Sequence, residues 1–522
     1  MALTETRPET DDPPVGADDR PIPGVVERLV GSGDHVAIGR LFVSFGFAMS
    51  TLFLSLLALT GVDTLTNNGF LGARTAQLAA SAQTGLLFLG VVPLLLGVAI
   101  AVVPLQLGSP AIAFPRAAAL SFWTWLVSSG IFLTSLAIDG GVLGTDETAA
   151  KLGNLSLGAS LVSLGLGAVC VATTVMSHRP LGMRLAWVPG LSWASFVSAA
   201  LLLVTLGSAV AHVVLGQVGR MAPAALATNF TDGLGWLFRG PAVFVFAIPV
   251  LGIAADVVAN ATGRRLGNTD LVQLVIGMYA VLAFGAWAQL PSALNTAVWS
   301  VFALAITVPV LGMLGALADA LRHGSVRLTP ATLLAVVGVV LLLGAVVTGW
   351  VQALSLLGQG QLFGASAATL AAAQTAFVAA AGIAGGAAAS MHWAPLLWGG
   401  YGTSTEARLS TPLIILGGGL LGTATLVQAI VQLDGETTAS QVFGAAEALG
   451  AALFALGALG ALVAAVRSSG DDTGDEPVEG GLTLEWAFPA PASGGVGLAD
   501  LSRVTSPYPL LDAREGSGEE NA

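Results

Sequence analysis

The sequence predicts an all-α integral membrane protein, a bundle of twelve transmembrane helices. Two observations carry this prediction. First, 55% of the 522 residues are hydrophobic and only 10% are charged, whereas soluble domains carry roughly 25% charged residues. Second, the apolar residues form continuous runs of about 20, the length that a helix needs to span the hydrocarbon core of a bilayer. The strands of a bacterial β-barrel would alternate apolar and polar residues instead.

Twelve segments of the chain meet this length requirement. Backbone groups inside lipid must find hydrogen-bond partners within their own segment, so each segment is predicted to be a helix. Together they form a membrane domain over residues 35–466. The predicted helices cover residues 40–61, 84–105, 118–138, 155–176, 192–215, 237–259, 271–289, 297–319, 330–352, 368–390, 411–433 and 443–466.

The two ends of the chain carry most of its acidic charge. Residues 1–34 hold eight carboxylates and three arginines, a composition that predicts a disordered acidic arm. Residues 467–522 hold eleven carboxylates and three arginines and are predicted to form an acidic cytoplasmic tail. Within this tail the run Leu484-Glu485-Trp486-Ala487-Phe488-Pro489 is too apolar to serve only as a tether. The chain has no basic patch, so no nucleic-acid partner is expected.

An even number of helices places both ends of the chain on one side of the membrane. With the ends in the cytoplasm, fifteen basic residues fall on the cytoplasmic side, and three, Arg74, Lys151 and Arg220, fall on the other. This positive-inside bias predicts a multi-pass protein of the cell membrane with both termini cytoplasmic. The single cysteine, Cys170, excludes an intrachain disulfide and is expected to be a small buried hydrophobe.

Four stretches of the sequence, in order, resemble subunit I of the haem–copper terminal oxidases, the cytochrome c oxidase type. The most specific stretch contains Val103-Pro104-Leu105-Gln106 and Ala113-Phe114-Pro115-Arg116 within residues 93–123. The resemblance covers about residues 34–514 and implies twelve helices with both ends inside. It also implies two haems and a copper ion held by six histidines, since imidazole is a good ligand for both metals. The other three stretches are residues 34–41, 240–253 and 482–486.

None of the six ligand positions keeps a histidine when the family's motifs are carried onto this sequence. The family's tyrosine that is cross-linked to a copper ligand becomes Phe244. We therefore expect a divergent member with no catalytic residues, no bound haem and no bound copper. The haem-ligand positions are occupied by Ala82, Ala373 and Thr375, and the copper-ligand positions by Gly240, Gln289 and Leu290.

Two further polar residues are candidates for a role within the membrane. His212 is either a replacement axial ligand or, the interpretation that we prefer, a hydrogen-bonded residue at a helix end. Arg239 lies within the sixth segment, where a charge is costly unless it is paired or reaches the interface. It either extends to water or forms a buried pair with Asp232. Asp256 is expected to face lipid headgroups, and Trp393 is expected to lie at the membrane interface.

The tenth segment is unusually rich in small residues, with eleven alanines and three glycines among residues 371–390. Such residues let helix backbones approach closely and so close the space that haems would occupy. Alternatively, they leave a cavity for a lipid or a quinone. The sequence leaves both interpretations open.

Three functions are compatible with these observations. The first is a haem-free structural or regulatory subunit of a respiratory-chain complex, with the lipid bilayer and other membrane subunits as partners. The second is an active terminal oxidase that uses haem and copper, and the third is a transporter or lipid-binding protein. For the first, Trp486 and Phe488 are expected to anchor the tail on partner subunits, because aromatic residues dominate interface energies.

Overall fold

The protein is built from helices, and the computed structural model contains no strand among the residues that it describes. The ends of these helices set which parts of the chain can meet. The described residues are 33–66, 69–142, 144–180, 182–221, 242–267, 269–284, 296–357, 367–400, 404–431, 437–468, 481–487, 504 and 506–520.

Eleven helices within the described ranges are long and apolar enough to cross a membrane. A further apolar helix, α10 (Thr269–Phe284), has 16 residues. The prediction of an all-α integral membrane protein is therefore confirmed, whereas the count of twelve spans stays a prediction. The eleven spans are formed by α2 (His35–Thr66), α3 (Thr75–Gly85) together with α4 (Val92–Gln106), α5 (Pro115–Ala137), α6 (Glu147–Ser177), α7 (Gly190–Met221), α9 (Ile248–Thr262), α11 (Thr296–Ala305) together with α12 (Thr307–His323), α13 (Pro330–Leu357), α14 (Ala367–His392), α16 (Thr405–Val431) and α17 (Thr437–Arg467).

Several helix starts are fixed by local chemistry that the sequence contains. The side chain of Asp146 accepts a hydrogen bond of 2.7 Å from the backbone N–H of Ala149 and so caps α6. Asp34 does the same for Val36 at the start of α2, over 2.9 Å. Such caps satisfy N–H groups that have no partner inside the helix. α13 begins with Pro330, whose fixed φ suits the first helical position.

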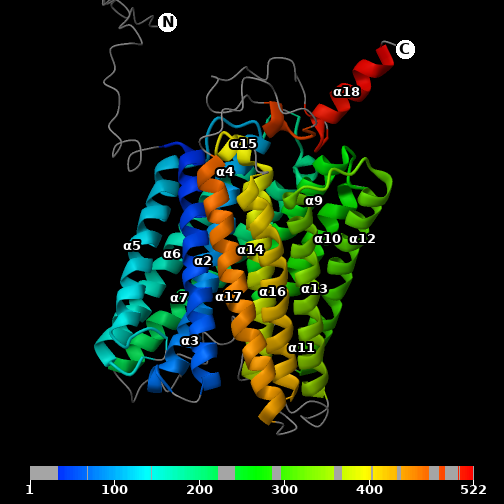
Figure 1. Ribbon diagram of the computed structural model, residues 1–522. Coiled ribbons are helices and arrows are strands. Elements are labelled where there is room, and N and C mark those ends of the chain that lie inside the picture. The colour runs from blue at the N-terminus through cyan, green and yellow to red at the C-terminus, as the bar shows by residue number, and fades with distance from the viewer. Residues whose placement is uncertain are drawn as a thin grey trace, which may run out of the picture.

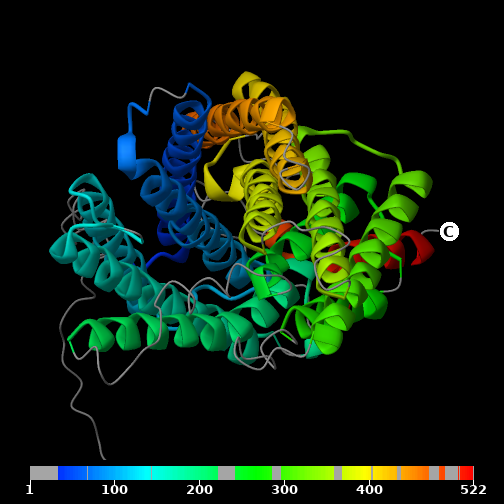
Figure 2. The same cartoon turned by 90° about the horizontal axis from the view of Figure 1, so that it is seen from below.

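The helices stand side by side. The chain enters the bundle and leaves it at the same end. α2 begins and α17 ends at this end, where the short helices α15 (Ala394–Leu397) and α18 (Pro509–Glu520) also lie (Figure 1). We call this the tail end of the bundle. Seen along the bundle, α14 is enclosed by other helices (Figure 2). It contacts α13, α16, α9 and α4.

Three spans form the inside of the bundle, and the others surround them. α3 continues into α4 through the π-helical turn η2 (Leu86–Val91), and the most apolar stretch of this span is completely buried. The most apolar stretches of α9 and α14 are also buried along nearly all of their length. The surrounding helices expose large apolar side chains such as Val281 and Leu409 to the outside. That exposure is expected for helices that face lipid.

Candidate functional site

The residues that the resemblance matches to the family's haem ligands lie on two of the inner spans. Ala82 is on the last turn of α3, and Ala373 and Thr375 are on α14. Ala82 and Ala373 have no accessible surface at all, so no void large enough for water adjoins them. The Thr375 hydroxyl donates to the carbonyl oxygen of Ala371 over 2.8 Å. The two methyl groups offer no ligand atom for iron, and the hydroxyl is engaged with its own helix, so haem does not fit at these positions.

The small residues of α14 bring it into direct contact with the neighbouring inner span. A Cβ atom added at Gly382 would lie 2.3 Å from Cγ1 of Val91 in η2. One added at Gly386 would lie 2.6 Å from Cδ2 of Leu94 in α4. Glycine allows this approach, whereas a Cβ at either position would force the Val91 or Leu94 side chain to move. Of the two interpretations of the small residues, close packing holds along this part of α14.

Other positions near the former metal site are filled by aromatic and amide groups. Phe244, at the family's tyrosine position, meets the ring of Tyr279 edge to face with centroids 5.8 Å apart. Gln374 on α14 donates from Nε2 to the carbonyl oxygen of Ala345 on α13 over 3.2 Å. These contacts tie α14 to α13, and η5 (Ala242–Ala247) to α10.

The side chains of the remaining predicted site residues lie outside the part of the chain that the structure describes. Arg239, Gly240, Gln289 and Leu290 lie outside the described residues. His212 belongs to α7, but its side chain is not among those described. The expectation that the chain binds neither haem nor copper therefore stays a prediction. Cys170 is completely buried, as expected.

The structure reveals a buried polar cluster at the tail end that the sequence reasoning missed. Gln106, the last residue of α4, donates from Nε2 to Oδ2 of Asp256 over 2.8 Å and to Oε1 of Glu485 over 3.2 Å. Trp393 donates from Nε1 to the same Glu485 oxygen over 3.1 Å. The Gln106 oxygen accepts from the hydroxyl of Ser192 over 2.7 Å. We call Gln106, Ser192, Asp256, Trp393 and Glu485 the tail-end cluster.

Asp256 holds together the ends of two helices. Besides Gln106, its carboxylate accepts from the backbone N–H groups of Gly190 and Leu191, over 2.9 and 2.8 Å. These are the first two residues of α7, whose N–H groups have no acceptor within the helix. A negative charge near a helix N-terminus is also favoured by the helix dipole. The expectation that Asp256 faces headgroups is wrong, because its side chain is almost completely buried.

The cluster fastens the C-terminal segment onto the bundle. Residues 481–487, which include the turn η9 (Leu484–Ala487), lie over the tail end, as the orange segment in Figure 1 shows. The backbone N–H of Leu482 donates to the Asn260 side chain over 2.9 Å, and its carbonyl oxygen accepts from Leu510 of α18 over 3.2 Å. Arg265, beyond the end of α9, forms an ion pair with Asp512 of α18 at 2.5 Å.

Two expectations about aromatic residues are corrected here. Trp486 is buried in its own chain, where its ring meets His392 edge to face at 5.3 Å, so it is not available to anchor a partner subunit. Phe488 lies outside the described residues. Trp393 is completely buried under the C-terminal segment and does not lie at the membrane interface. Sequence reasoning treated both tryptophans as surface anchors because their partners are distant in the chain.

The electrostatics of the cluster depend on two carboxyl groups that share one amide donor. Glu485 is completely buried, and this burial raises the pKa of its carboxyl group, while hydrogen bonds from Trp393 and Gln106 lower it to a smaller extent. Because Glu485 is one acid in a run of apolar residues, a buried partner could have been suspected from the sequence. Gln106, at the end of an otherwise apolar helix, is the other signal.

The fold defines a class, a multi-spanning bundle of the haem–copper oxidase subunit I type. The family described as "Cytochrome C and Quinol oxidase polypeptide I" matches residues 36–433, and the chain belongs to this family. A solved structure of a heme-copper terminal oxidase dimer has the same fold, with a TM-score of 0.62 at 14% identity, over 92% of this chain and 89% of that one.

Curated relatives agree with this assignment. Cytochrome c oxidase subunit 1 of Bacillus subtilis (strain 168) is 26% identical over 473 residues, which cover 81% of this chain and 73% of that protein. The corresponding subunit of Bacillus sp. (strain PS3) is 29% identical over 280 residues, 49% of this chain. A putative cytochrome c oxidase subunit 1-beta of Streptomyces avermitilis is 29% identical over 252 residues, 43% of this chain. The matches cover 45% and 44% of the last two relatives, less than half of their length.

Proposed function

We propose that this protein is a haem-free, non-catalytic subunit of a respiratory-chain membrane complex, with a structural or regulatory role. The observation that carries the proposal is the pair Ala82 and Ala373. Two methyl groups stand where the family has haem ligands, and both are packed without any adjoining void. A haem needs a ligand atom for its iron and a space for its ring, and these positions provide neither.

Close packing of α14 supports the same proposal. Deleting a large cofactor from a bundle would leave a cavity, and cavities cost roughly 24 cal/mol per Å³. The contacts of Gly382 with Val91 and of Gly386 with Leu94 bring the two spans together without such a cavity beside this part of α14. A bundle without a cofactor space would keep its outer surface, and that surface is what a structural subunit needs. The proposal includes an orientation with both termini in the cytoplasm. This orientation rests on the excess of basic residues on the side of the termini.

Membership of the oxidase family supports one alternative, an active terminal oxidase with haem and copper. An optical spectrum separates the two. The protein purified in mild detergent and reduced with dithionite is expected to show no haem bands, and metal analysis no stoichiometric iron or copper. An oxidase subunit I purified from the same membranes serves as the positive control. A low-spin haem signal at one per chain would overturn the proposal and would make His212 the first ligand to test.

The proposed association with other membrane subunits needs a separate experiment. Tagged protein extracted gently from its own membranes is expected to bring other membrane subunits with it in a fixed ratio. If the intact chain elutes alone as a monomer, the structural proposal fails, and a transporter or lipid-binding function becomes the better explanation.

A further inference from the structure

We propose that a groove between α13 and α16 binds an anionic phospholipid from the leaflet at the tail end. The groove has a volume of about 520 Å³, within the range of roughly 300–1,000 Å³ that small-molecule sites occupy. It lies where the first turns of the two helices face the outside of the bundle. No described residue in its lining is acidic.

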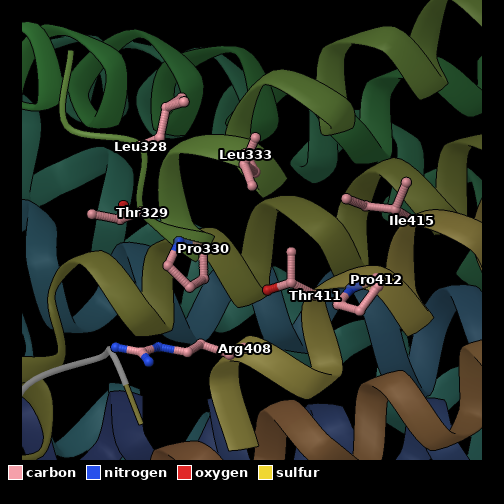
Figure 3. Close-up of a pocket in the computed structure, with 8 residues that line it drawn as sticks. All are labelled: Leu328, Thr329, Pro330, Leu333, Arg408, Thr411, Pro412 and Ile415. Carbon is pink, nitrogen blue, oxygen red and sulfur yellow. The ribbon is translucent and has the colours of Figure 1, made fainter. Parts of the chain in front are cut away.

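Among the described residues of its lining, the groove has its one charged side chain at one end and mainly apolar side chains at the other, as a lipid has its headgroup and its chain. Leu328 lies at the charged end, and Thr411 lies beside Pro412 (Figure 3). Figure 3 shows the Arg408 guanidinium and Thr329 at one end and Ile415 and Pro412 at the other, with Leu333 beside the apolar part. Arg408 and Ile415 are seven positions apart on α16, about 10 Å along the helix axis at 1.5 Å per residue. The groove is therefore long enough for a headgroup and the first part of an acyl chain.

The depth of the groove in a membrane fits this assignment. α16 has 27 residues, which makes it about 40 Å long, while the hydrocarbon core is about 30 Å thick. If the length of α16 beyond the hydrocarbon core is divided equally between its two ends, about 5 Å of helix lies in the headgroup region at each end. Arg408 is then at the boundary between headgroups and hydrocarbon, where lipid phosphates lie. Ile415 is in the hydrocarbon, and Leu333, three residues into α13, is at the same boundary as Arg408.

The charge of the residues at one end of the groove determines which kind of lipid headgroup it favours. The Arg408 side chain is exposed and has no ion-pair partner among the described residues. The acid two positions before it, Glu406, is already paired with Arg467. A second exposed arginine, Arg327, directly precedes the groove residue Leu328. A guanidinium group binds phosphate through two parallel hydrogen bonds, so this end of the groove favours an anionic headgroup.

A second groove shows what the charge adds. It lies beside α10, has about the same volume, 530 Å³, and is also lined mainly by apolar side chains, but its polar residues include Asp270. An acid in that place repels a phosphate. The two grooves are similar in size, but the one beside α10 has an acid in its lining and the one between α13 and α16 has Arg408, which suits an anionic lipid.

The experiment compares lipid binding by matched variants of the whole chain. The protein is placed in phosphatidylcholine nanodiscs, phosphatidylglycerol is titrated in, and bound phosphatidylglycerol is counted by native mass spectrometry. Arg408→Gln is expected to weaken the tightest phosphatidylglycerol site about ten-fold, the effect of losing one charged hydrogen-bonded pair. Arg322→Gln is the control, because Arg322 is an exposed arginine on the last turn of α12 outside the groove.

A second variant tests the apolar half. Ile415→Trp fills the groove and leaves Arg408 in place, so it is expected to cause a similar loss of phosphatidylglycerol. Equal binding by the wild type and both groove variants would overturn the proposal. So would a co-purifying subunit that is lost from Arg408→Gln while lipid binding stays unchanged, because a protein would then cover the groove.

Discussion

Trp393 and Glu485 lie 92 positions apart in the chain and are joined by a hydrogen bond of 3.1 Å from the indole Nε1 to the carboxylate Oε1. The bond links the segment that follows α14, an inner helix, to the C-terminal segment. Gln106 extends the link to α4 and, through Asp256, to α9 and the start of α7. The cluster thus connects the inner spans at one end of the bundle.

Removing the carboxylate of Asp256 is expected to destabilise the whole bundle. Asp256→Ala leaves the buried N–H groups of Gly190 and Leu191 without their acceptor and removes one of the two acceptors of the Gln106 amide. Each unsatisfied buried donor costs about 1–3 kcal/mol, so a total of about 3 kcal/mol or more is expected. Thermal unfolding in detergent measures the effect. Asp319→Ala, at an exposed acid of α12, is the control and should change stability by less than about 0.5 kcal/mol. Equal midpoints for both variants would refute the role of Asp256.

Attachment of the C-terminal segment is expected to weaken as the pH rises. Burial raises the pKa of Glu485 above its ordinary value of 4.5, so the attached segment holds the proton more tightly than the released one. Attachment is strongest below about pH 4.5 and weakens by up to about 1.4 kcal/mol per pH unit above it, until the raised pKa is reached. Hydrogen exchange of residues 481–487 reports the attachment, because the N–H of Leu482 is bonded to Asn260 only in the attached state.

Glu485→Gln separates the titration of this carboxyl group from that of its neighbour Asp256. The amide keeps an oxygen that can accept from Trp393 and Gln106, but it does not titrate. Exchange in this variant should be independent of pH over the same window, after correction for the intrinsic rate. If the variant keeps the pH dependence of the wild type, another group of the cluster is responsible.

Close packing between α14 and η2 predicts a specific rescue. Gly382→Ala places a Cβ against Val91 and is expected to cost about 1–3 kcal/mol as overpacking. Val91→Ala removes the opposing Cγ1, so the double variant should recover part of that loss. Gly277→Ala on α10 meets no atom within 4 Å and should be neutral or slightly stabilising. If Gly382→Ala proves as stable as Gly277→Ala, the space beside α14 is open, and the argument against a cofactor there is lost.

Orientation can be tested with single cysteines. In a Cys170→Ala background, Thr10→Cys and Gly480→Cys should resist membrane-impermeant thiol reagents in intact cells, while Thr145→Cys, at an exposed position, should react. The basis is the excess of basic residues on the side of the termini. The reverse pattern would show that the termini are outside, and different labelling of residues 10 and 480 would exclude an even number of spans.

The sequence by itself determined the class of fold and the family, and it predicts the loss of the ligands. Apolar runs of about 20 residues specify membrane helices locally, because each helix satisfies its own backbone hydrogen bonds. The identities of Ala82, Ala373 and Thr375 can likewise be taken from the motifs alone. Helix α18 was not predicted, because its 12 residues carry no apolar run.

Only the tertiary structure decided which polar residues meet and how closely α14 packs against the neighbouring span. Gln106 and Glu485 are 379 positions apart, and no local pattern specifies a contact over such a distance. Asp256 and Trp393 were assigned to the membrane surface because each, considered alone, suits a helix end near headgroups. Their burial depends on the C-terminal segment that covers them. Small residues on α14 are equally compatible with a cavity and with contact, and the positions of Val91 and Leu94 on the neighbouring span made the difference.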